Sequence, residues 1–98
     1  MNKATIKQTI SEANANKEIK WGVAENTAEK IVLTNSYDKS VKFTIKIGAD
    51  FITVRDNLMG NAVEYFSKGD SRFDDYANDD DGVKRAIKTA VIYFNRTY

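Results

Sequence analysis

A strict alternation of apolar and polar residues between positions 41 and 47 is the feature that most constrains the fold of this chain. Apolar side chains occupy every second position, with lysine and threonine between them: Val41, Phe43, Ile45 and Ile47. A period of two is typical of a β-strand with one buried face. We therefore expect a sheet with one covered face and one solvent-exposed face.

Two shorter alternations precede this strand and predict two more. Ile19, Trp21 and Val23 alternate with polar residues or glycine, and a second set follows around residues 30–34. The connections at 25–28 and 35–39 are short and rich in turn-forming residues, which suits antiparallel hairpins better than crossovers. The pattern predicts a three-stranded meander.

Apolar residues at helical spacing occur both before and after the predicted strands. Ile6, Ile10 and Ala13 predict a short helix over 4–15. A stronger apolar face predicts a last helix, with Asp80 or Asp81 as its N-cap. That face consists of Val83, Ala86, Ile87, Ala90, Val91 and Phe94.

The segment from 51 to 66 admits two interpretations. Its apolar residues fit one face of a long helix that begins after Asp50 and contains Gly60. The β-branched run at 52–54 favours a short fourth strand at 51–54 instead, followed by a helix capped by Asp56. We take the long helix as the prediction and the strand as its alternative.

These elements predict a single α+β domain over residues 1–98. Hydrophobic residues make up 42% of the 98-residue chain and charged residues 30%, as in ordinary folded domains. The expected order is α-β-β-β-α-α, with helices covering one side of a three-stranded antiparallel sheet.

The absence of two residue types limits the chemistry that this chain can perform. The chain has no histidine, which removes the commonest general base and zinc ligand, and no cysteine. We therefore expect no enzyme activity, no cofactor and no metal site. No run approaches the roughly 20 apolar residues that span a bilayer, so we expect a cytoplasmic protein without membrane contact.

Residues 70–81 form an acidic stretch that holds six aspartates. An EF-hand centred on Gly82 fails, because Ala77 and Lys88 would occupy its first and last ligand positions. Part of the stretch can stabilise the start of the last helix, whereas clustered like charges also suit a basic partner. The candidate partner-binding residues are Asp70, Asp74, Asp75, Tyr76, Asp79, Asp80 and Asp81.

A lysine-rich sheet face is the alternative binding surface. Lys20, Lys42 and Lys46 should project from the open face, with Lys30 near them, and could follow a nucleic-acid backbone. Such faces are also common as solvated surfaces that prevent edge pairing, and no aromatic residue is expected there for base stacking. We therefore expect the acidic stretch to be the binding site.

In size, element order, lack of cysteine and position of the acidic stretch, the chain is similar to small phage-encoded anti-CRISPR proteins that inhibit Cas9. That resemblance implies an inhibitor that presents acidic residues to a basic DNA-binding site of a host protein, such as Cas9 with its guide RNA. The alternatives are a small nucleic-acid-binding accessory protein that uses the lysine face, or an immunity or adaptor protein.

Overall fold

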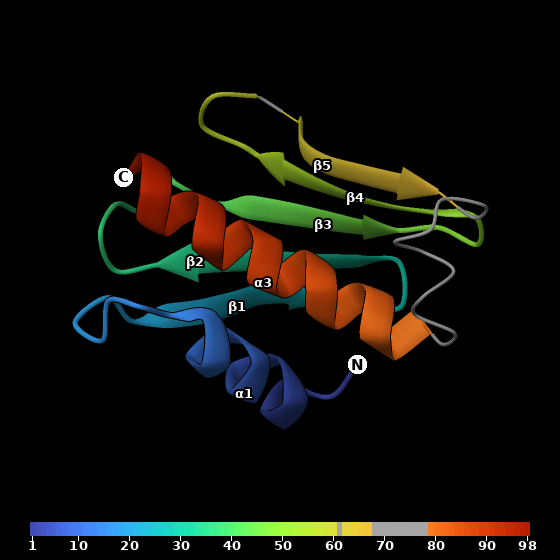
Figure 1. Ribbon diagram of the computed structural model, residues 1–98, viewed down its shortest axis with the longest axis horizontal. Coiled ribbons are helices and arrows are strands. Elements are labelled where there is room, and N and C mark those ends of the chain that lie inside the picture. The colour runs from blue at the N-terminus through green and yellow to red at the C-terminus, as the bar shows by residue number, and fades with distance from the viewer. Residues whose placement is uncertain (61, 68–78) are drawn as a thin grey trace.

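The protein is an antiparallel sheet with both described helices on one face, as the computed structural model in Figure 1 shows. The structure describes residues 1–60, 62–67 and 79–98. Five strands follow one another in the order β1-β2-β3-β4-β5. The elements are α1 (Lys3–Ala13), β1 (Trp21–Asn26), β2 (Lys30–Asn35), β3 (Phe43–Ile47), β4 (Phe51–Asp56), β5 (Ala62–Ser67) and α3 (Asp79–Thr97). The α+β prediction is confirmed.

Helix α1 lies where the apolar spacing predicts it. The side chain of Asn2 caps its start by accepting a hydrogen bond from the backbone N–H of Thr5 at 2.8 Å. Ile6 and Ile10 are buried against the rest of the core. The helix therefore covers the β1 end of the sheet, and Figure 1 shows it beside α3.

The predicted meander is present as β1, β2 and β3, and its turns are held by side chains. The Thr27 hydroxyl accepts from the backbone N–H groups of Glu29 and Lys30 in the first turn. In the second connection, buried Asn35 donates to the carbonyl of Val41 and accepts from the N–H of Tyr37. These bonds satisfy backbone groups that would otherwise lack partners and set the register of the strands.

The prediction of a long helix after residue 50 is wrong. The chain instead forms β4 and β5, so the alternative strand at 51–54 is confirmed and continues to Asp56, but no helix follows it within the described residues. Leu58 and Met59 are 47% and 61% exposed in the turn between the strands, so they belong to no buried helix face. Gly60 follows them with a φ of 72°, which glycine adopts without steric cost.

One hydrophobic cluster holds the helices on the sheet, with Phe94 of α3 at its aromatic centre. The Phe94 ring meets Trp21 edge-on at 5.1 Å between centroids and stacks on Tyr98 at 5.4 Å. Phe43 of β3 meets the same ring edge-on at 6.5 Å between centroids. Trp21 is partly buried against this cluster, as its alternation with core residues predicts.

We expect Phe94→Ala to lower the free energy of unfolding by about 3–5 kcal/mol, since it removes a buried aromatic ring and leaves a cavity. Ile92→Ala, on the exposed side of the same helix, should change it by no more than about 0.5 kcal/mol. Urea denaturation followed by Trp21 fluorescence measures both. Equal effects would contradict the central role of Phe94.

A buried carboxylate connects the end of β4 to the end of the chain. Asp56 is fully buried, and its carboxylate accepts hydrogen bonds from the backbone N–H of Leu58 at 3.0 Å and from the Tyr98 hydroxyl at 2.7 Å. This hydrogen bond, helped by burial and by the negative charge of Asp56, raises the pKa of Tyr98 from 10.0 to about 12. The protonated tyrosine therefore stabilises the folded state.

Because the pKa of Tyr98 is higher in the folded state, its stabilisation is complete below its ordinary pKa of 10.0 and is lost as the pH rises through about 12. Denaturation at a series of alkaline pH values should show this loss in the natural protein and much less of it in Tyr98→Phe. At neutral pH, Tyr98→Phe should be less stable by about 1–3 kcal/mol, because the carboxylate loses a donor. Identical pH profiles would contradict this role.

Candidate functional site

The predicted acidic site lies largely outside the described residues. Asp70, Asp74, Asp75 and Tyr76 fall in the undescribed segment 68–78. Helix α3 begins at Asp79, so residues 79–81 form its first turn. Asp80 and Asp81 therefore lie inside the helix, and the prediction that one of them is its N-cap is wrong.

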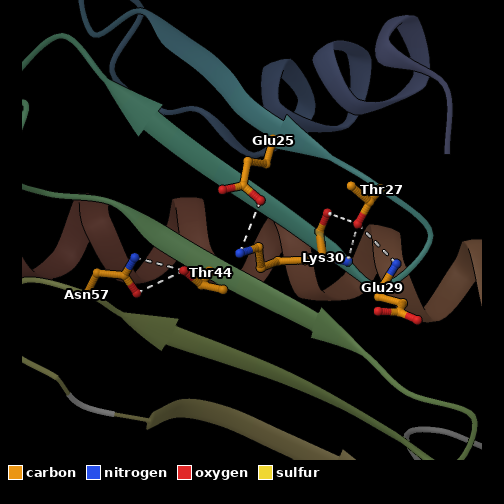
Figure 2. Close-up of polar contacts among 6 residues, drawn as sticks. All are labelled: Glu25, Thr27, Glu29, Lys30, Thr44 and Asn57. Carbon is orange, nitrogen blue, oxygen red and sulfur yellow. Dashed lines mark hydrogen bonds and ion pairs between the residues drawn. The ribbon is translucent and has the colours of Figure 1, made fainter.

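The exposed face of the sheet brings three cations together. Lys30 of β2 is the direct partner of Lys46 of β3, and Lys46 is in turn the partner of Thr53 of β4. Arg55 follows Thr53 by two positions, so it points to the same face and lies diagonally from Lys46. The helices cover the opposite face of the sheet (Figure 1), and Figure 2 shows Lys30 on the side away from them. Through the register, Lys46 and Arg55 share that side.

The two lysines repel one another, and one carboxylate offsets only part of that charge. Directly opposed like charges on neighbouring strands destabilise a sheet. Glu25 of β1 pairs with Lys30 at 3.1 Å, and both side chains are partly exposed. Among the described residues, Lys46 has no ion pair. The face therefore carries an excess of positive charge centred on β3.

Polar groups surround these cations in a shallow hollow of about 280 Å³. Arg55 donates through Nη1 to the carbonyl of Gly60 at 2.8 Å, which anchors the guanidinium beside the β4–β5 turn. The hydroxyl of Thr44 and the side-chain amide of Asn57 bond to each other, with the closer contact at 2.8 Å (Figure 2). The lining residues include no carboxylate: Lys30, Thr44, Lys46, Thr53, Arg55 and Asn57.

Two exposed aromatic rings lie on the same face, beside the cations. Tyr65 of β5 is the partner of Thr53, and its ring stacks with that of Phe51 at 6.4 Å between centroids and 20° between planes. Tyr65 is 57% exposed and Phe51 39%. A side chain at Gly48 would collide with the Phe51 ring, so this glycine allows the ring to lie across the β3–β4 turn.

We call the set Lys30, Lys46, Phe51, Arg55 and Tyr65 the cationic face. The sequence predicted two of its members, Lys30 and Lys46, on one surface. It predicted Lys20 there as well, but Lys20 lines a different hollow, between α1 and β1. Lys42 is exposed just before β3 and lines neither hollow on the cationic face.

The expectation that this face lacks an aromatic residue is wrong. It followed from placing Phe51 and the residues after it on a helix. The alternation of Phe51, Thr53 and Arg55 with the buried Ile52 and Val54 could have predicted a strand that places Phe51 on the exposed face.

Within the described part of the chain, no cluster of three or more acidic side chains could hold a metal ion. No helix there is long and apolar enough to cross a membrane. Comparisons with known protein families, curated proteins and solved structures found no match to this chain. The candidate function therefore depends on the geometry of the site.

Proposed function

We propose that this protein is a non-catalytic binding protein whose cationic face binds the phosphate backbone of a nucleic acid. The observation that carries the proposal is the direct opposition of Lys30 and Lys46 with Arg55 diagonal to them, in a hollow that no carboxylate lines. Gathering like charges in this way costs stability, and an anionic ligand offsets that cost. A polymer with regularly spaced phosphates can meet all three cations at once.

The salt dependence of binding tests this proposal. Three phosphate contacts should make the logarithm of the binding constant fall with the logarithm of salt concentration at a slope of about −2 to −3. Fluorescence anisotropy of a labelled oligonucleotide of about 16 nucleotides measures the slope in dilute and physiological salt. Affinity that does not change with salt would contradict backbone binding.

Lys46→Glu should separate binding from stability. It replaces a repulsive cross-strand pair with an attractive one, so the free energy of unfolding should rise by about 0.2–1 kcal/mol while binding weakens sharply. The matched control is Lys3→Glu, an exposed lysine in the first turn of α1 on the covered side of the sheet. Equal weakening by both variants would show that net charge matters and the cationic face does not.

A second candidate function is inhibition of a host nucleic-acid-targeting protein, of the anti-CRISPR type, through the acidic stretch. Six aspartates in residues 70–81 favour it. The backbone of residues 79–81 forms the first turn of α3, where negative charge also stabilises the helix dipole. Asp70, Asp74 and Asp75 precede this helix in the sequence and lie outside the described residues, and we propose them as the residues for a basic partner.

Replacing these three aspartates with asparagine should abolish inhibition of a purified Cas9–guide RNA complex in a DNA-cleavage assay, while Lys46→Glu should leave it unchanged. Loss of charge in the stretch removes the attraction to a basic groove but leaves the described core residues intact. Cleavage that the natural protein does not slow would exclude this target.

A further inference from the structure

We infer that the cationic face takes a single strand of nucleic acid, with its phosphates on the lysines and arginine and an unpaired base stacked on Tyr65 and Phe51. This inference rests on the proposed function, because it assigns the form of nucleic acid that the same face binds. It requires cations and exposed rings on one continuous surface.

The register of the sheet provides that surface. Lys30, Lys46, Thr53 and Tyr65 are successive partners across β2, β3, β4 and β5, so they form one row perpendicular to the strands. Neighbouring strands lie about 4.8 Å apart, which places the backbone at Tyr65 about 10 Å from that at Lys46. Bases project sideways from the backbone that carries them. A strand held at the lysines can therefore present a base over β4 and β5.

A second hollow connects the two lysines to the Phe51 ring. It lies at the β3–β4 turn and shares Lys30 and Lys46 with the first, while Phe51 lines its far side. Glu25 and Glu29 also line this second hollow. Its charges are thus balanced, unlike those of the first. We therefore place the phosphates at the first hollow, whose lining includes Arg55 and neither Glu25 nor Glu29.

The exposed rings favour a single strand over a duplex. An aromatic ring stacks on a base only where the face of that base is free, and in a duplex the neighbouring base pairs cover it. The rings of Tyr65 and Phe51 stack on one another with 20° between their planes, and both remain partly exposed. An unpaired base can therefore extend this stack on an outer ring face. An acidic peptide without aromatic residues would meet the cations equally well but would gain no stacking on these rings.

The test compares a labelled oligothymidine of about 16 nucleotides, an RNA of the same length, and a hairpin duplex, by fluorescence anisotropy with the full chain. Tyr65→Ala should weaken binding of both single strands about tenfold or more and leave the duplex unchanged. Tyr65→Phe should restore the affinity because it keeps the ring. The matched control is Tyr37→Ala, whose tyrosine is equally exposed, at 59%, but packs against Phe94 on the covered side of the sheet.

The outcomes separate this inference from the proposed function. If Lys46→Glu abolishes binding but the natural protein binds the duplex as tightly as the single strands and Tyr65→Ala has no effect, the single-strand inference is overturned and backbone binding stands. Displacement of the oligonucleotide by an equal charge concentration of polyglutamate would likewise overturn it. Failure to bind any of the three probes in dilute salt would overturn both.

Discussion

The fold depends on one-sided burial. Helix α3 lays its apolar face across the sheet, and Phe94 joins Trp21 of β1, Phe43 of β3 and Tyr98 in one aromatic cluster. With α1 beside it, this layer covers a single face of the five strands. Since burial of apolar area is the main favourable contribution to folding, the sheet and this helix are each unstable without the other.

The same constraint leaves the opposite face free for polar and charged side chains. A strand with one buried face alternates, so in β3 and β4 the positions between core residues project to the other face. In β3 those positions hold Thr44 and Lys46, and in β4 they hold Phe51, Thr53 and Arg55. Because core packing does not restrict the residue types at these positions, they can carry side chains that bind a partner. The opposed lysines are what a purely structural surface would avoid.

Much of the fold followed from periodicity. The strands at the start of the sheet, helix α1 and the apolar face of α3 lie where spacing predicts them, because each pattern is long enough to exclude the other period. Residues 51–66 were different. Leu58 and Met59 lie in a turn, yet their spacing from Phe51 and Val54 imitates a helix face. The β-branched run at 52–54 was the better guide, since it reports the local backbone preference.

The sequence by itself determined that this chain makes an antiparallel sheet with one covered face and one solvent-exposed face. It also determined that the chain has no histidine or cysteine side chain for catalysis or metal binding. Both conclusions follow from the sequence alone, because the first depends only on the local period of apolar residues and the second only on composition. Only the tertiary structure decided that Lys30 lies opposite Lys46, with Arg55 and Tyr65 on the same surface. Such neighbours come from strands far apart along the chain, and their register is set by turns and by the shared core rather than by any local pattern.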